Sequence, residues 1–390
     1  MDCKSAFRVL PVSSNLQSNH AGLATVEVLR GPESMDIVKL GATSLAWVRG
    51  DGETMKRLPS ILVTIAALLG MATAQKLPPL QLVRTTDLPG ITGDMDHLAV
   101  DLAGNRLFVA AEDNGTLRVL NLANGKLERT VKGFETPHSI LYLAKQHQLY
   151  ITDGSKDVKV LNSDTFKVEK LIPTTPGADS MAADTKHDVM WVVAGGKDVN
   201  MTRSVLTEIN TKEGKVVKQI PVDAAHVEAL ALQPQGPKLY VNVTDKNYLA
   251  VINRSTGKTL DEWHIQQAKQ NAPLAFDPVN HRLFVVCRDP GMLVVLDSRT
   301  GKTIASFPAG GVADGVVFDS IHHRIYVPAG AGAIYPYEEV GANHFRAMKP
   351  VPSAIGAKTA VLSPNAEYLY VSMSPGEKRV GAKVFTFKVN

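Results

Sequence analysis

The sequence has almost no cysteine, and it lacks the short motifs that mark many enzymes. Of its 390 residues only Cys3 and Cys287 are cysteines, and Cys3 precedes the predicted mature chain. One remaining thiol cannot form an intramolecular disulfide, so the fold must be held by its core. The motifs Gly-x-Ser-x-Gly, His-Glu-x-x-His, the P-loop and Cys-x-x-Cys-His do not occur. The net charge of +4 is too small to indicate nucleic-acid binding by itself.

An apolar run near the N-terminus is too short to span a membrane and has the features of an export signal. Its basic, apolar and small-residue parts follow in the usual order, as Met55–Arg57, Leu58–Met71 and Ala72–Ala74. The apolar part has about 14 residues, whereas a membrane helix needs about 20. We therefore predict that 55–74 is a signal peptide cleaved between Ala74 and Gln75. The mature chain, 75–390, would be periplasmic or secreted and free of the membrane.

The segment before this signal contains no repeat phrase and no catalytic motif. A signal peptide should begin a chain, yet residues 1–54 precede it. Our hypothesis is that translation starts at Met55 and that 1–54 is a non-native extension from a mis-assigned start.

The most informative feature of the sequence is a short hydrophobic phrase that occurs seven times. The copies are Arg106–Ala110, Gln148–Thr152, Val189–Val193, Lys238–Asn242, Arg282–Val286, Arg324–Pro328 and Tyr368–Ser372. Their starts are 42, 41, 49, 44, 42 and 44 residues apart. A period of about 40–50 residues made of short strands is typical of a β-propeller, in which each unit is one blade. We predict an all-β, seven-bladed propeller of four-stranded antiparallel blades.

The last unit is one strand short. The chain stops soon after Ala382–Lys388, whereas Leu82–Leu88 precedes the first inner strand and belongs to no unit. We predict that this N-terminal segment becomes the outer strand of the seventh blade, which closes the ring and removes an exposed sheet edge. Two units deviate from the pattern, with an insertion at Gly195–Arg203 and an atypical second half at Ala333–Val351.

Several phrases are close to the repeat consensus of a known family. They are Leu239–Val243, Ile325–Pro328 and Ser255–Lys258, although a literal Tyr-Val-Thr-Asn does not occur. Over about 80–390 the chain resembles the YncE-like, YVTN-type seven-bladed propellers. The resemblance implies the propeller fold; that family is functionally mixed, includes proteins with no demonstrated activity, and some of its members bind single-stranded DNA.

One repeat position, just before each inner strand, is mostly polar or charged. Its seven occupants are Asp96, His138, Asp179, Glu228, Ala272, Asp314 and Lys358, with His97, His226, Asn271 and Thr359 as immediate neighbours. In a propeller the chain crosses there from the outer strand of one blade to the inner strand of the next. We therefore expect these residues to converge around the central channel at one face.

Such a ring can be interpreted in three ways. It can be a solvated funnel or a set of hydrogen bonds that tie neighbouring blades. It can be a ligand site, with Asp96, His97, His226, Asn271, Lys358 and Thr359 as contacts. It can also be a metal-dependent catalytic site, with Asp96, Asp179, Glu228 and Asp314 as ligands of a divalent cation (Ca²⁺, Mg²⁺ or Zn²⁺) and His138 and Glu228 moving protons. Asp101, Asp277 and Asp319, at the ends of inner strands, are interpreted as turn-stabilising residues.

These interpretations give two main functional hypotheses. The first is an exported, monomeric binding propeller that holds a small molecule or a protein partner at the channel mouth. The second is a metal-dependent hydrolase similar in type to gluconolactonase and lactonase propellers, whose signatures are not evident here. A third, single-stranded nucleic-acid binding, depends on basic loop residues: Lys156, Lys197, Arg203, Lys246, Arg288, Lys378 and Arg379. Nucleic acid is not the expected partner, because no Arg/aromatic interleaving provides a stacking platform.

Overall fold

The computed structural model describes residues 26–30, 35–40, 44–49, 77–234, 236–376 and 381–390. They belong to two compact units, Met1–Lys76 and Leu77–Asn390. The first contains an antiparallel sheet of β1 (Val26–Arg30), β2 (Met35–Leu40) and β3 (Ser44–Arg49), which the sequence analysis did not predict. The predicted signal peptide at 55–74 lies outside the described residues. In the described parts of the chain, no helix has the length and apolar character needed to cross a membrane.

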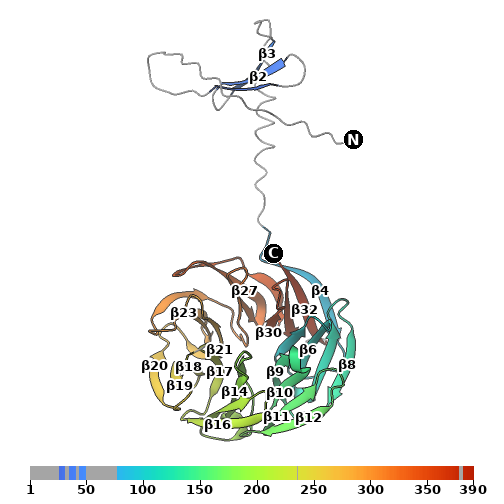
Figure 1. Cartoon of the computed structure of the whole chain (residues 1–390), viewed down its shortest axis with the longest axis vertical. Coiled ribbons are helices and arrows are strands. Elements are labelled where there is room, and N and C mark those ends of the chain that lie inside the picture. The colour runs from blue at the N-terminus through green and yellow to red at the C-terminus, as the bar shows by residue number, and fades with distance from the viewer. Residues whose placement is uncertain (1–25, 31–34, 41–43, 50–76, 235, 377–380) are drawn as a thin grey trace. The chain divides into compact units, whose positions relative to one another are not determined.

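The second unit is a seven-bladed β-propeller, as the repeat predicts (Figure 1). In each of the first four blades the strands follow in sequence order from the axis outward. Blade 1 consists of β5 (Leu98–Asp101), β6 (Arg106–Ala111), β7 (Thr116–Asn121) and β8 (Leu127–Lys132); blade 2 of β9 (Pro137–Leu143), β10 (Gln148–Asp153), β11 (Asp157–Asn162) and β12 (Val168–Pro173); blade 3 of β13 (Met181–Asp184), β14 (Val189–Gly195), β15 (Ser204–Asn210) and β16 (Lys215–Val222); blade 4 of β17 (Val227–Leu232), β18 (Lys238–Val243), β19 (Tyr248–Asn253) and β20 (Thr259–His264).

The remaining blades include the atypical sixth unit and the closing seventh. Blade 5 consists of β21 (Lys269–Asp277), β22 (Arg282–Asp289), β23 (Gly291–Asp297) and β24 (Thr303–Pro308); blade 6 of β25 (Val317–Asp319), β26 (Arg324–Ala329), β27 (Ala331–Gly341), β28 (His344–Ala347) and β29 (Val351–Ile355); blade 7 of β30 (Ala357–Leu362), β31 (Tyr368–Met373), β32 (Ala382–Val389) and β4 (Leu80–Leu88). In blade 6 the long β27 pairs with both β28 and β29, which makes a five-stranded sheet. Short 3-10 helices occupy Glu112–Asn114 (η2), Ala144–Gln146 (η3) and Lys197–Val199 (η4), the last inside the predicted insertion of blade 3.

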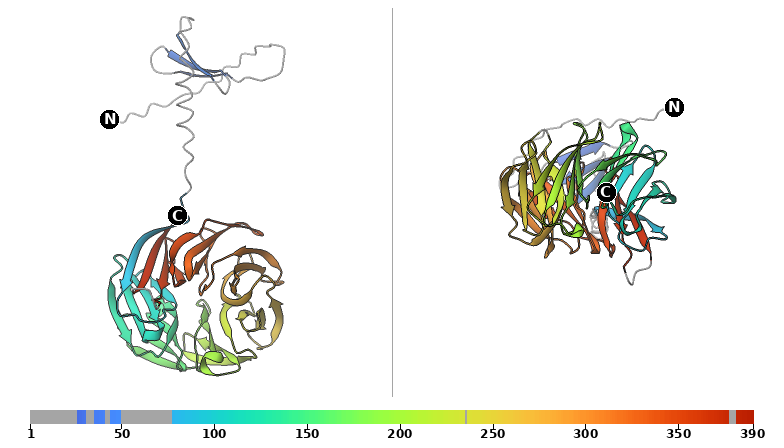
Figure 2. Two further views of the ribbon diagram at one scale, coloured as in Figure 1. Left: turned by 180° about the vertical axis from the view of Figure 1, so that it is seen from behind. Right: turned by 90° about the horizontal axis from the view of Figure 1, so that it is seen from below.

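The N-terminal strand of the propeller completes its last blade, as predicted. β4 pairs antiparallel with β32, in a register that runs from Leu88 opposite Ala382 to Leu80 opposite Val389. The first strand of every blade contacts the first strands of both neighbouring blades, in the order β5, β9, β13, β17, β21, β25, β30 and back to β5. Figure 2 shows the same ring from behind. The seven sheets therefore form a closed circle around a common axis.

The aromatic residue of each repeat phrase forms the core between blades. Phe108, Trp191, Tyr240, Phe284 and Tyr326 have no exposed surface. These side chains alternate along their strands with residues that face the other side of the same sheet, so both faces of each blade are apolar. Tyr240 of blade 4, for example, packs with Leu283 and Val285 of blade 5. Full burial of such a ring stabilises the fold by about 2–3 kcal/mol.

An acid–arginine pair fixes the turn between the first two strands and reaches the next blade. Asp101 accepts hydrogen bonds from the Gly104 N–H at 2.8 Å and from Arg106 Nε at 2.9 Å. The Arg106 guanidinium also donates to the carbonyl of Ser163 in blade 2. Equivalent turn bonds are made by Asp277 and Asp319, to the N–H groups of Val279 and Ile321. The interpretation of these three aspartates as turn-stabilising residues is confirmed.

We predict that the closing blade depends on the packing of its buried core. Phe387 of β32 is fully buried in a cluster that includes Leu80 of β4. Phe387→Ala should therefore lower the free energy of unfolding by about 3–5 kcal/mol, measured by urea denaturation. Val83→Ala, on the exposed side of β4, is the control and should change it by less than about 0.5 kcal/mol. Equal effects of the two substitutions would contradict this assignment of the closing core.

Candidate functional site

The last residue of the repeat phrase positions the polar ring of the next blade. Thr152, which ends the phrase in blade 2, donates a hydrogen bond through Oγ1 to the carbonyl oxygen of Asp179 in blade 3 at 2.6 Å. Asn242 of blade 4 donates through Nδ2 to the carbonyl of Ala272 in blade 5 at 2.8 Å. The backbone of the ring position is thereby held by the neighbouring blade. Neighbouring blades are thus tied by Thr152 and Asn242 and not by the side chains of the ring position, which are left to face the channel.

The backbone of Asp96 is held both by its own blade and by blade 7. Its N–H donates to the carbonyl of Ala110 at 3.0 Å, and its own carbonyl accepts from Thr359 Oγ1 at 2.9 Å. Ser372, which ends the phrase in blade 7, has its Oγ 3.4 Å from the same carbonyl. Thr359 has no exposed surface. Its side chain therefore positions Asp96 and does not line the cavity.

A cavity of about 620 Å³ occupies the channel mouth and is lined by side chains from all seven blades. Its wall is strongly acidic. The carboxylates are Asp94, Asp96, Glu112, Asp179, Asp198, Glu228 and Asp314, against the bases Arg288 and Lys358 and the histidines His97, His138 and His226. The predicted convergence of Asp96, His138, Asp179, Glu228, Asp314 and Lys358 is therefore what the structure shows.

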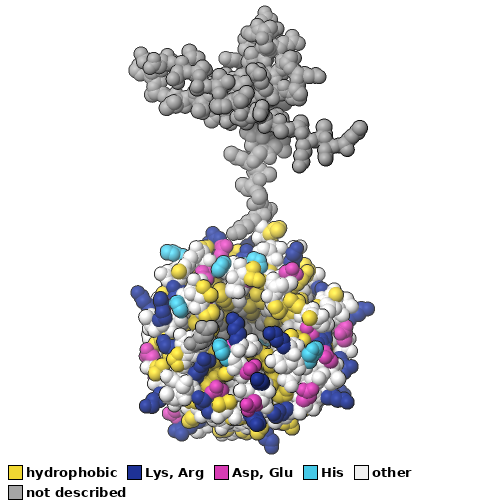
Figure 3. Space-filling view, viewed as in Figure 1, with side chains coloured by type: hydrophobic (Ala, Val, Ile, Leu, Met, Phe, Trp, Pro, Cys, Tyr) yellow, Lys and Arg dark blue, Asp and Glu magenta, His cyan; other side chains and the backbone are white. Residues whose placement is uncertain are grey.

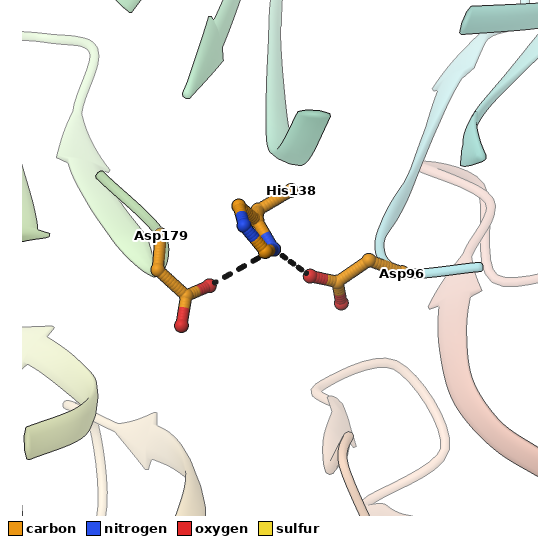
Figure 4. Close-up of side chains that lie close together, drawn as sticks. All are labelled: Asp96, His138 and Asp179. Atoms are coloured by element: carbon orange, nitrogen blue, oxygen red, sulfur yellow. Dashed lines mark hydrogen bonds and ion pairs between the residues drawn. The ribbon is translucent and has the colours of Figure 1, made fainter. Parts of the chain in front are cut away.

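The side chains in this cavity form two groups, and the first surrounds His138 (Figure 4). His138 Nδ1 lies 2.9 Å from Asp96 Oδ2, 3.8 Å from Asp179 Oδ1 and 4.0 Å from Glu112 Oε2. These residues come from the entries to blades 1, 2 and 3 and, for Glu112, from η2 directly after β6. The donor atoms of Asp96, His138 and Asp179 all lie within 4.8 Å of one another, which is close enough for a shared cation.

The crowding of this first group changes the pKa values of its members. Burial raises the pKa of Asp179 to about 7, and the negative charges of Asp96 and Glu228 add to that effect. Burial likewise raises the pKa of Glu112 to about 7. For His138 burial acts in the opposite direction, but the hydrogen bond with Asp96 and the surrounding carboxylates outweigh it and raise its pKa to about 10.

Asp96 and His97 complete this first group. Burial acts to raise the pKa of Asp96, but His97 and the hydrogen bond with His138 outweigh it, so the pKa lies well below its usual range. His97 Nε2 is 3.5 Å from Asp96 Oδ1, and the surrounding carboxylates raise the pKa of His97 against the effect of its burial. Asp96 is therefore a permanent anion beside two histidines, whereas Asp179 and Glu112 exchange protons near neutral pH.

The second group is a network of paired charges around Arg288. The guanidinium donates to Glu228 Oε1 at 3.1 Å and to Asp314 Oδ1. Glu228 also contacts His226 Nε2 at 2.8 Å, and Lys358 Nζ is 3.1 Å from Asp314 Oδ2. Burial acts to raise the pKa of Glu228, yet its hydrogen bond with His226 and the charge of Arg288 hold the pKa below its usual value. Glu228 and Asp314 are thus neutralised by cations of the protein itself.

The structure also separates the ring from residues that sequence reasoning grouped with it. Asn271 has no exposed surface, and its side chain donates to Asn242 Oδ1 at 2.9 Å and to the Tyr248 carbonyl at 3.0 Å. It therefore supports the wall from behind.

Glu112 was missed because it is not at the repeat position, although it follows the second strand, on a loop expected at the same face. Arg288 was assigned to the basic loops, whereas it lies inside the cavity.

Three of the basic loop residues are paired with carboxylates. Arg203 pairs with Asp223 at 3.0 Å, Lys246 contacts the same residue, and Arg288 is engaged by Glu228 and Asp314. Lys378 and Arg379 lie outside the described residues. On the face drawn in Figure 3, Lys and Arg side chains lie around the periphery of the ring and also beside its centre.

Comparisons with known proteins agree with the fold and give no family. No protein-family model and no curated protein matches the chain. Among solved structures, a chain of the mitotic checkpoint complex is similar with a TM-score of 0.65 and 13% identity, over 81% of this chain and 94% of that one. A chain of hydrazine synthase from Kuenenia stuttgartiensis is similar with a TM-score of 0.64 and 14% identity, over 81% of this chain and 98% of that one. At such low identity the likeness shows the propeller fold alone.

The raised pKa of Asp179 predicts a pH dependence of stability. Between the usual aspartate pKa of about 4 and the folded value of about 7, the folded state binds more protons than the unfolded state. The free energy of unfolding should therefore fall as pH rises through this window, an effect screened by water because 38% of the Asp179 side chain is exposed. Asp179→Asn removes the free-energy cost of ionising Asp179 in the folded state. In urea denaturation, the stability of this variant relative to wild type should therefore be higher at pH 8 than at pH 4.5.

The matched control for this measurement is Asp188→Asn, in the same blade but outside the cavity. Asp188 has a φ of 55°, which asparagine tolerates, so the substitution does not strain the turn. Its stability relative to wild type should be the same at both pH values. If the stability of Asp179→Asn relative to wild type is lower at pH 8 than at pH 4.5, the predicted direction of the pH dependence is wrong.

Proposed function

We propose that this chain is an exported, YncE-like binding protein whose channel-mouth cavity holds a small, positively charged ligand. The observation that carries the proposal is the acidic cavity of about 620 Å³ built from all seven blades. Its volume is in the range of small-molecule sites, about 300–1,000 Å³. The export part of the proposal depends on the signal-like segment at 55–74 and the family part on the repeat phrases.

The charge balance of the cavity supports a cationic ligand. Arg288 and Lys358 are already paired with Glu228 and Asp314, so they offset that half of the wall. In the other half a protonated His138 balances one of the three carboxylates Asp96, Asp179 and Glu112, so the negative charges there outnumber the positive ones once Asp179 and Glu112 have lost their protons. Walls of low dielectric constant concentrate the field of such unbalanced charges and raise the local concentration of ligands of opposite sign.

The proposal predicts selective binding of small organic cations. In isothermal titration calorimetry at low salt, the full chain should bind spermidine and should not bind citrate. Glu112→Gln/Asp179→Asn should weaken spermidine binding at least about tenfold, because charged hydrogen bonds contribute about 1.5–3 kcal/mol each. Asp188→Asn is the control and should bind as wild type does. Preference for citrate, or unchanged binding by the double variant, would contradict the proposed function.

A second candidate function, hydrolysis of lactones, is favoured by one observation. Asp179 and Glu112 have pKa values of about 7 beside His138, and a general base acts best when its pKa is near the working pH. In this candidate Asp179 accepts the proton from water. Glu228, predicted from sequence as a proton carrier, is bound in ion pairs with Arg288 and His226.

If the chain is such a hydrolase, it should hydrolyse gluconolactone with a rate that depends on the ionisation of Asp179. We expect the rate to rise with pH through about 7, and Asp179→Asn to lower it by 10²-fold or more, as loss of a general base does. The measurement is a pH-indicator assay with and without added divalent cation, with Asp188→Asn as the control. Absence of hydrolysis under both conditions would leave the binding function alone.

A further inference from the structure

We infer that Asp96, His138, Asp179 and Glu112 form a site for one divalent transition-metal ion. The inference deepens the proposed function, on which it rests, because it names the cation that the acidic half of the cavity takes. It also differs from the ligand set predicted from sequence, in which Glu228 and Asp314 stood with Asp96 and Asp179. Those two carboxylates are excluded because Arg288 and Lys358 already occupy them.

The spacing of the donor atoms fits a first coordination sphere. Zinc binds nitrogen and carboxylate oxygen at about 2.0–2.2 Å, so neighbouring ligand atoms around one ion are about 3–3.6 Å apart. His138 Nδ1 is 2.9 Å from Asp96 Oδ2, 3.8 Å from Asp179 Oδ1 and 4.0 Å from Glu112 Oε2. The donor atoms of Asp96, His138 and Asp179 all lie within 4.8 Å of one another and supply the first three ligands. Glu112, whose Oε2 is 4.0 Å from His138 Nδ1, is the proposed fourth ligand.

The backbone that carries these donors is fixed before any ion binds. Asp96 is held by Ala110 and Thr359, and Asp179 by the hydrogen bond from Thr152. The four side chains come from blades 1, 2 and 3, whose first strands are in contact. Ordering the site therefore costs little entropy, which favours affinity.

The types of donor indicate the class of metal. Imidazole nitrogen suits zinc, iron, nickel and copper, whereas sites made only of oxygen suit calcium and magnesium. One imidazole with three carboxylates is therefore a site for Zn²⁺ or Mn²⁺ in preference to Ca²⁺ or Mg²⁺. With the carboxylates ionised, the protein donors carry three negative charges, and a divalent ion offsets two of them.

Binding at Nδ1 requires that the proton on this nitrogen leave. The metal forms a bond to the Nδ1 lone pair, and the proton passes to solvent or buffer, so binding releases a proton. The carboxylates must likewise be ionised to bind the ion. Protons therefore compete with the ion for the donor atoms, and the affinity must increase as pH rises.

The test is metal titration of the full chain with two histidine variants, one inside the cavity and one outside it. His138→Gln removes the proposed nitrogen ligand, whereas His187→Gln removes an exposed imidazole of blade 3 that pairs with Asp184. With Zn²⁺ and Mn²⁺ in calorimetry, wild type should bind one ion, more tightly at pH 8 than at pH 6. His138→Gln should weaken binding at least about tenfold, and His187→Gln should leave it within about threefold.

A second readout keeps the inference falsifiable if a variant is unstable. Co²⁺ bound to wild type should give a visible absorption band that is lost in His138→Gln and in Asp179→Asn, while Asp188→Asn retains it. Circular dichroism establishes that each variant is folded. Absence of one-to-one metal binding, or equal binding by wild type and a folded His138→Gln, overturns the metal site.

The outcomes separate this inference from the function on which it rests. If spermidine binds and Zn²⁺ and Mn²⁺ do not, the metal site is wrong and the cation-binding cavity stands. If neither binds, both are wrong. If Ca²⁺ binds as tightly as Zn²⁺ and independently of His138, the ligand set is wrong, because an oxygen-only site is then present elsewhere.

Discussion

The hydrogen bond from one blade to the entry of the next is the contact on which the site depends. Thr152 holds the carbonyl of Asp179, Asn242 that of Ala272, and Thr359 that of Asp96. A buried carbonyl needs a partner, and supplying it from the neighbouring blade fixes the angle between the two sheets. At Asp96 and Asp179 the same bond positions a residue whose acidic side chain lines the cavity, so the stability of the ring and the geometry of the cavity have a common cause.

The cavity is divided because Lys and Arg pair with Glu228 and Asp314 in one half of it, whereas histidines contact the carboxylates of the other half. Arg288, from the second strand of blade 5, reaches both Glu228 and Asp314 and balances that half of the wall. Among the residues that the structure describes, no Lys or Arg lies within ion-pair distance of Asp96 or Asp179, and histidines are their partners. This asymmetry follows from two cations, Arg288 of blade 5 and Lys358 of blade 7, that both reach the other half. Residues that occupy the same repeat position in the sequence therefore lie in two different chemical environments in the structure.

The sequence predicts the fold well and the site in part. The repeated phrase predicts the number of blades and the order of their strands. The strand at Leu82–Leu88, which belongs to no repeat unit, predicts how the ring closes. Both predictions depend on the periodicity of the sequence. Repeat alignment also brings Asp96, His138 and Asp179 together. It does not give their pairing, since Glu112 in η2 and Arg288 near the end of β22 lie outside the repeat position. The extra strands of blade 6 and the sheet β1–β3 also lack a repeat signal.

The pairing of β4 with β32 makes the ends of the propeller meet in one sheet. In chain order β4 precedes every other strand of the propeller, whereas its partner β32 follows all of them. Each of the other blades is built from a continuous stretch of chain. The ring therefore cannot close before β32 has been synthesised.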